Sequence, residues 1–224
     1  MIILMYDFLK EVYDKLLGEK ELSPKNILDF IIENYECFEP NWHALGFIHC
    51  KLLDFGSGSL RLHFWSDKLK HADEQLEKIH DHLFSLKIYV ISGKIKNEVF
   101  VVSEATSKKF THYAYTVKYG EGYSYLIPSD NYFYDVSTSS EEITASGEYY
   151  GINSSSFHRS NLTNEGFALT LVATYEHLKK EPITLSTIEN ESYKYRKFLP
   201  YDKVEWRRIL MECRDGLTEN IRAD

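Results

Sequence analysis

The chain has 224 residues, a formal net charge of -8 and three cysteines that form no Cys-x-x-Cys pair. This length is enough to bury a substantial core in one domain. An acidic chain without a long basic block lacks the charge that binds phosphate backbones, so we expect no nucleic-acid partner. The scattered cysteines, and a short apolar start without the basic region of a signal peptide, predict a soluble, cytoplasmic protein with no membrane partner.

Two amphipathic helices are expected at the start of the chain. Apolar residues recur at helical spacing over residues 8–17. Ser23 and Pro24 suit the N-cap and first turn of a second helix that ends near Tyr35. We expect this helical extension, residues 1–36, to pack on a β-body.

The middle of the chain is rich in short runs of β-branched and aromatic residues, which indicate antiparallel strands. The predicted strands are residues 47–53, 60–65, 83–91, 98–102, 113–119, 123–127, 132–136, 143–150, 156–160 and 167–175. So many short strands favour a sandwich or barrel. We expect one domain over residues 1–224, with a β-barrel at 47–175 and a largely irregular extension at 176–224 in which Asp202 opens a short helix.

Three histidines carry the clearest chemical signal. His80 and His82 are two residues apart, so on a strand both imidazoles point to the same side and can reach one metal ion. They stand at the start of a predicted strand that runs toward Gly93. His158, from a later strand, would complete a site with open coordination positions for water, substrate or dioxygen.

Ordinary structural roles are the alternative for these histidines. Asp81 could pair with His80, and His158 could be a core histidine bonded to a carbonyl group. The other histidines show no paired ligand spacing, and we expect them to be surface or core residues, with His63 as a second-line candidate for the site. These others are His43, His49, His71, His112 and His177.

The spacing of these residues resembles the two motifs of the cupin superfamily, Gly-x5-His-x-His-x3,4-Glu-x6-Gly and Gly-x5-Pro-x-Gly-x2-His-x3-Asn. His80, His82 and Gly93 match the first motif, and Gly147 and His158 match the second. The resemblance implies an all-β core of the cupin type, a double-stranded β-helix or jelly-roll barrel, with two N-terminal helices and a short C-terminal helix added.

The chain departs from the cupin motifs at defined positions. Leu86 stands where the motif has its glutamate ligand, and Asn153 and Ser155 replace the proline and the second glycine. Without the glutamate, the resemblance implies a metal site of three histidines.

Three-histidine cupins are typified by the thiol dioxygenases, and this chain looks like cysteine dioxygenase around residues 79–82 and 158–175. The resemblance implies Fe(II) at the three histidines, with zinc, nickel or manganese as alternatives. It also implies a small-molecule substrate, a thiol or related carboxylate, that reacts with dioxygen. Tyr175 stands at the position of the family's active-site tyrosine, and Arg61 would hold the substrate's carboxylate. The serine and histidine partners of that tyrosine are replaced by Leu171 and Ala173.

Other functions stay open at this stage. A non-catalytic cupin could bind a small ligand and use its metal for structure or regulation, and the missing partners of Tyr175 favour that hypothesis. A sugar isomerase or epimerase would usually keep the glutamate ligand, so we rank it last. The charged run at residues 67–78 predicts a helix or loop over the barrel mouth, and an edge strand could pair across a homodimer.

Overall fold

The computed structural model describes residues 2–70, 78–105, 110–121, 123–163, 166–178, 180–189, 191–196 and 199–220. Most of the charged run expected over the barrel mouth falls at residues 71–77 and lies outside the described residues.

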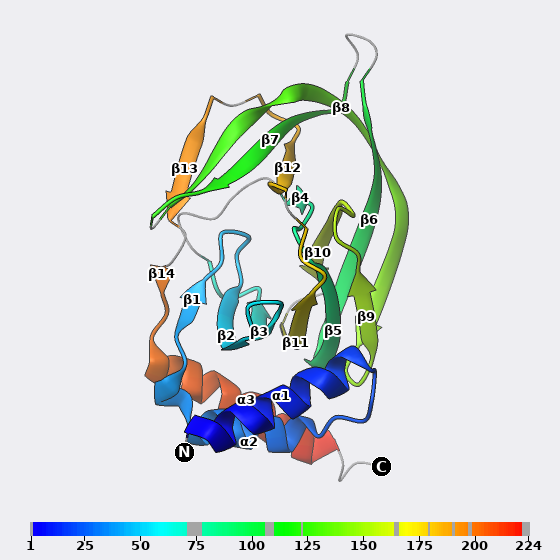
Figure 1. The fold of residues 1–224 in the computed structure, drawn as a ribbon. Helices are drawn as coiled ribbons and strands as arrows, with labels where there is room; N and C mark the ends of the chain where they lie inside the picture. Colours follow the sequence, from blue (N-terminus) through cyan, green and yellow to red (C-terminus); the bar gives the residue numbers. More distant parts are fainter. Residues whose placement is uncertain are drawn as a thin grey trace.

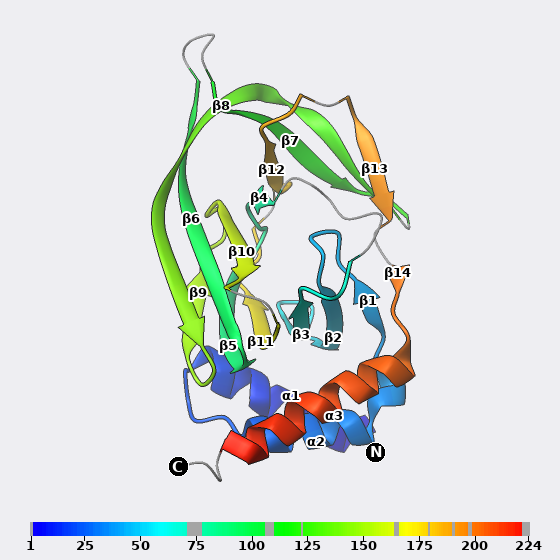
Figure 2. The same ribbon diagram turned by 180° about the vertical axis from the view of Figure 1, so that it is seen from behind.

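Two antiparallel sheets of seven strands each pack face to face as a β-sandwich (Figures 1 and 2). The helix-side sheet contains β1 (Pro40–Trp42), β2 (Ile48–Asp54), β3 (Ser59–Ser66), β5 (Ser85–Ser92), β9 (Tyr149–Ile152), β11 (Phe167–Tyr175) and β14 (Leu199–Pro200). The second sheet contains β4 (Ile79–His80), β6 (Lys94–Glu104), β7 (His112–Tyr119), β8 (Tyr123–Ala145), β10 (His158–Leu162), β12 (Ile183–Ser186) and β13 (Tyr193–Arg196). This arrangement is consistent with the jelly roll that the motifs predict.

The strands are not ordered along each sheet as they are along the chain. The helix-side sheet has the order β14-β1-β2-β3-β11-β5-β9, and the second sheet has the order β13-β8-β6-β10-β4-β12-β7. The two long strands β6 and β8 run up one side of the sandwich, and β8 curves over its upper end (Figure 1). Segments far apart in the sequence therefore meet between the sheets.

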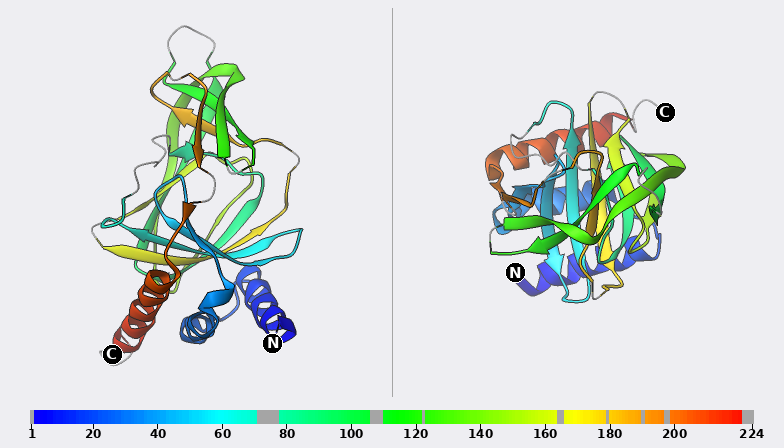
Figure 3. Two further views of the ribbon diagram at one scale, coloured as in Figure 1. Left: turned by 90° about the vertical axis from the view of Figure 1, so that its left-hand side faces the viewer. Right: turned by 90° about the horizontal axis from the view of Figure 1, so that it is seen from above.

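Three α-helices of the described chain cover the outer face of the helix-side sheet (Figure 3). They are α1 (Ile2–Leu17), α2 (Pro24–Glu33) and α3 (Lys203–Asn220), and a short 3-10 turn, η1 (Tyr35–Cys37), follows α2. The two predicted N-terminal helices are confirmed, although the side chain of Ser23 makes no capping bond. None of the described helices is both long and apolar enough to cross a bilayer.

The last helix is longer than the short one that the sequence predicted. Asp202 does open it, since its Oδ1 accepts a hydrogen bond from the Glu205 backbone N–H at 2.8 Å. Trp206, the largest fully buried side chain, then packs under the sheet. Arg214, beyond the predicted apolar stripe, forms an ion pair with Asp29 of α2 at 3.0 Å, and such contacts extend the helix.

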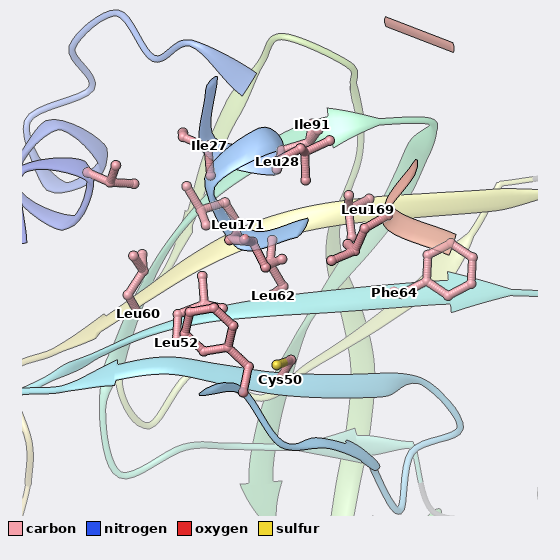
Figure 4. Close-up of a cluster of buried hydrophobic side chains, with 14 of the residues drawn as sticks. Ile27, Leu28, Cys50, Leu52, Leu60, Leu62, Phe64, Ile91, Leu169 and Leu171 are labelled. Atoms are coloured by element: carbon pink, nitrogen blue, oxygen red, sulfur yellow. The ribbon is translucent and has the colours of Figure 1, made fainter. Parts of the chain in front are cut away.

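The main core lies between the helices and the helix-side sheet (Figure 4). Leu28 of α2 and Leu62 and Leu171 of the sheet are all fully buried there. Because successive strand residues alternate between faces, the neighbours of Leu171 point the other way, into the sandwich. The helix-side sheet therefore has one face against the helices and one face toward the second sheet.

The longest strand corrects the sequence-based prediction. Separate strands were expected at 123–127, 132–136 and 143–150, but β8 runs without a break from Tyr123 to Ala145. Its polar residues looked like turn signals, yet they are largely exposed and their backbone is paired with β7 over the first half and with β6 over the second. Three short strands, β12, β13 and β14, also replace part of the irregular extension expected after residue 175.

The two glycines of the motifs lie together at one corner. Gly93 and Gly147 have φ angles of +80° and +89°, a region that glycine enters readily and other residues rarely adopt. The Ser146 backbone N–H donates to the Gly93 carbonyl at 3.0 Å, and the Gly147 N–H donates to the Val90 carbonyl at 2.9 Å. The turn after β5 and the turn after β8 are thereby joined. A Cβ on Gly93 would lie 2.2 Å from the carbonyl oxygen of Phe167, so this position has no room for a side chain.

Candidate metal centre

The structure brings His80, His82 and His158 together between the two sheets. One ligand nitrogen from each of the three lies within 4.8 Å of the others. The ring centroids are 4.7 Å apart for His80 and His82, 4.5 Å for His80 and His158, and 4.9 Å for His82 and His158. A group of this kind could hold a metal ion.

The histidine pair does not share one strand, which corrects the expected local geometry. His80 ends β4, while His82 lies in the loop before β5. Asp81 anchors that loop: it is only 3% exposed, accepts a hydrogen bond from the Ile183 backbone N–H at 2.7 Å and forms an ion pair with Lys180. Asp81 therefore holds the loop against the segment that leads into β12, and it makes no hydrogen bond with His80.

His158 enters the centre from the first residue of β10. This residue is 2% exposed and lies opposite His80 on β4 and opposite Val99 on β6. The next residue, Arg159, donates two hydrogen bonds to the Glu98 carboxylate, at 2.8 and 2.9 Å. This bidentate pair fixes β10 on β6, and with it the position of His158.

Hydrogen bonds set the tautomers of two of these histidines. The Nδ1 of His80 lies 2.9 Å from the Lys78 carbonyl oxygen, and the Nδ1 of His158 lies 3.2 Å from that of Ser156. Because a carbonyl oxygen only accepts, each Nδ1 must carry the proton and each Nε2 keeps its lone pair. Metal-binding histidines in proteins are commonly oriented in this way, so the residues present fit a metal ion.

The surroundings also keep the three imidazoles in the form that binds metals. Burial lowers the pKa of His80, lowers that of His82 well below its usual value, and lowers that of His158 to about 3. Only a neutral imidazole has a lone pair for a metal ion, so no proton has to leave these rings when a metal binds near neutral pH.

The centre opens on a cavity of about 410 Å³ between the sheets. Its wall combines the three histidines with aromatic rings and only a few charged groups. The aromatic residues of the wall are Trp42, Phe47, Trp65, Phe84, Tyr119 and Tyr150. A mostly apolar cavity with a few polar groups is the usual form of a small-molecule site.

Arg61 lies in the wall of this cavity, on β3. Its Nε donates to the Ser59 Oγ at 2.7 Å, and its guanidinium carbon lies 5.0 Å from the centroid of the Phe84 ring. Phe84 in turn stacks on His82, with 5.1 Å between centroids and 14° between the planes. Burial lowers the pKa of Arg61, but an arginine stays protonated in proteins. Within the described chain this cation has no ion pair, so it can receive an anionic ligand.

Tyr175 is not brought to the cavity. It ends β11 on the same face as Leu171 and Ala173, whose side chains pack against the helices. The alternation of side chains along β11 therefore places this tyrosine on the opposite side of the sheet from the three histidines.

A second group of histidines lines the same cavity; of these the sequence had indicated only His63, as a second-line candidate. His43, His49 and His63 all belong to the wall, with Phe47 stacked on His43 at 4.3 Å. His49 and His63 are direct partners across β2 and β3. Arg61 and His63 are two residues apart on β3, and this spacing indicates that both side chains lie on the cavity face of the strand. Nothing in the sequence marks His43, because it lies in a loop, where side chains follow no regular alternation.

No family model matches this sequence, and no curated protein is significantly similar to it. The likeness to cupins therefore depends on the motif spacing and on the structure: two antiparallel sheets of seven strands with a three-histidine group between them fit a cupin-like β-sandwich or barrel.

Proposed function

We propose that this protein is a metal-binding cupin of the non-haem Fe(II) dioxygenase type, with a small thiol or related carboxylate as its substrate. The observation that carries the proposal is the convergence of three neutral imidazoles, two of them with Nε2 left free by a bond from Nδ1 to a backbone carbonyl. An Fe(II) ion at this place would supply a Lewis acid with open positions for substrate and dioxygen. Zinc, nickel and manganese are the alternative occupants.

The chain's own residues would bind the substrate's carboxylate and exclude water from the cavity. Arg61 is placed to pair with a carboxylate, and it is separated from His82 by the Phe84 ring. A ligand bound to Arg61 would therefore extend past Phe84 toward the metal centre. The aromatic wall removes water from that path, which strengthens the attraction between the guanidinium and an anionic group.

A non-catalytic cupin that binds a small ligand is the second candidate. It has the same metal centre and the same cavity, so both candidates share Arg61 and the three histidines. The position of Tyr175 favours this second candidate. Tyr175 matches the catalytic tyrosine of thiol dioxygenases in sequence spacing, but it does not line the cavity. The two candidates differ only in whether dioxygen is consumed.

Elemental analysis beside a His82→Ala variant tests the centre, with His112→Ala as the control because His112 lies on β7 and is absent from the cavity wall. We expect one metal per chain after reconstitution with Fe(II), lost in His82→Ala and kept in His112→Ala. Oxygen uptake with cysteine, 3-mercaptopropionate and cysteamine then tests the chemistry. Oxygen uptake with cysteine and 3-mercaptopropionate, and much less with cysteamine, would support the dioxygenase. A full metal content without oxygen uptake would favour the binding protein. No metal in the parent protein would overturn both candidates.

A further inference from the structure

His43 stands at the start of a tight loop that joins β1 to β2. Its backbone N–H donates to the Phe47 carbonyl at 2.7 Å, and its carbonyl accepts from the Gly46 N–H at 2.9 Å. Gly46 has a φ of +88°, which lets the chain reverse within so few residues. The ring of His43 stacks on Phe47, with 11° between the planes. Both the backbone and the ring of His43 are therefore fixed.

This loop is tied directly to the metal centre. Lys78 donates from Nζ to the Leu45 carbonyl at 2.9 Å, and the carbonyl of the same lysine accepts from the Nδ1 of His80 at 2.9 Å. His43, His80 and His82 all line one cavity. His43 thus shares a cavity with the three histidines, and its loop is bonded to the lysine whose carbonyl orients His80.

The tautomer of His43 is the opposite of that of the metal-binding candidates. The Leu45 backbone N–H donates to the Nδ1 of His43 at 3.2 Å, so this nitrogen must hold a lone pair. The proton of the neutral ring is then on Nε2. Among the described residues this N–H has no hydrogen-bond partner. His80 and His158 keep a lone pair at the corresponding nitrogen, whereas His43 keeps a donor.

We propose that His43 donates a hydrogen bond from Nε2 to an anion held at the three-histidine centre, and that it is not a fourth metal ligand. The anion is a small inorganic ion or the anionic group of the substrate. The inference rests on the metal centre of the proposed function. A fixed donor inside a mostly apolar cavity favours negative charge at the position it faces, without any rearrangement when the anion binds.

Azide binding to the full-length protein reconstituted with Co(II) tests this role, since cobalt gives a visible spectrum that changes when an anion binds. We expect His43→Phe to weaken azide binding by about tenfold or more, the usual effect of losing a hydrogen bond to a charged group. His43→Gln, whose amide N–H can replace Nε2–H, should restore most of the affinity. His112→Phe, outside the cavity, is the matched control, and every variant should keep one cobalt per chain.

The outcomes separate this role from the metal centre itself. Equal azide affinity in the parent protein, His43→Phe and His43→Gln, with cobalt retained, would overturn the role of His43 and leave the metal centre standing. Loss of cobalt in both His43 variants would make this residue a ligand and also overturn the proposal. A parent protein that takes up no cobalt would overturn the metal centre and with it this role.

The tautomer can be measured without any metal and without a variant. Long-range 1H–15N correlation spectra of the metal-free, 15N-labelled protein distinguish a ring protonated at Nε2 from one protonated at Nδ1. We expect His43 to carry its proton on Nε2, and His80 and His158 to carry theirs on Nδ1. A His43 ring protonated at Nδ1 would overturn the proposal even if His43→Phe failed to fold.

Discussion

His158 lies directly opposite His80 in the antiparallel pairing of β10 with β4. Strand β4 has only two residues and is held between β10 on one side and β12 on the other, where Thr184 is the partner of His80. The third histidine reaches the same place from a loop held by Asp81. The geometry of the centre therefore depends on long-range pairing and on one buried carboxylate.

Replacing Asp81 should destabilise the protein and disturb the centre. In Asp81→Ala, Lys180 loses its ion pair and the Ile183 N–H loses its acceptor. We expect the free energy of unfolding to fall by about 2–3 kcal/mol, with a weaker metal affinity because His82 is no longer held. Urea unfolding of the metal-free protein measures the first effect. In the control Lys118→Ala, which breaks an ion pair with Glu181 whose two side chains are each 53% exposed, the change should be within about 0.5 kcal/mol.

Arg61 should control affinity for carboxylate ligands without affecting the metal. In Arg61→Gln the cavity loses its unpaired cation, and we expect the dissociation constant of a carboxylate-bearing ligand to rise by about ten- to a hundredfold. Isothermal titration with 3-mercaptopropionate, beside cysteamine as the ligand without a carboxylate, measures this difference. An equal loss for both ligands would show that the variant has disturbed the cavity in general.

Acid should destabilise the metal-free protein through its buried neutral histidines. Burial lowers the pKa of His49 from 6.5 to about 3 in the folded protein. Between pH 6.5 and 3, His49 binds a proton in the unfolded chain but not in the folded chain. The stability that the neutral His49 contributes is therefore fully present above pH 6.5 and is lost as the pH falls toward 3.

His49→Gln removes the imidazole that takes up this proton in the unfolded chain. The slope of unfolding free energy against pH, measured by urea unfolding from pH 6 to 5, should decrease by about 1 kcal/mol per pH unit. An unchanged slope would mean that the pKa of His49 is not lowered in the folded protein.

The corner that joins the two motif glycines should not tolerate a side chain. Gly93→Ala combines an unfavourable left-handed backbone with a Cβ 2.2 Å from the Phe167 carbonyl oxygen, and we expect a loss of about 3 kcal/mol in unfolding free energy. Gly56→Ala is the matched control, because Gly56 has a φ of +76° but no heavy atom within 4 Å of the added Cβ. Its loss should be about 1 kcal/mol. Thermal unfolding of the two variants measures the difference.

The parts of the fold with strong local patterns could be predicted from the sequence. The strand expected at 167–175 is β11 (Phe167–Tyr175) without any shift, because this run of apolar residues and threonines is buried on both faces over all but its two end positions. The first helices were predicted from apolar spacing and Pro24. The three histidines were predicted from motif spacing alone, and the structure brings them together.

The remaining features depend on contacts that no local pattern records. The polar residues of β8 are typical of turns, and only pairing with two neighbouring strands keeps them extended. Tyr175 was chosen by its distance from His158 along the chain, which does not say on which face of β11 it lies. His43 lines the cavity with its proton on Nε2, and that tautomer follows from one backbone hydrogen bond from Leu45, which depends on the shape of a loop.

The shortness of β4 has a consequence for the order in which the protein would acquire a metal at this centre. Two paired residues contribute too little to persist alone, so His80 takes up its place only when β10 and β12 are already in the sheet. An unfolded chain then offers no preformed centre, and a bound ion stabilises the native state by mass action. Metal occupancy would act as a reporter of complete folding, since a chain missing either neighbouring strand would be left without the ion.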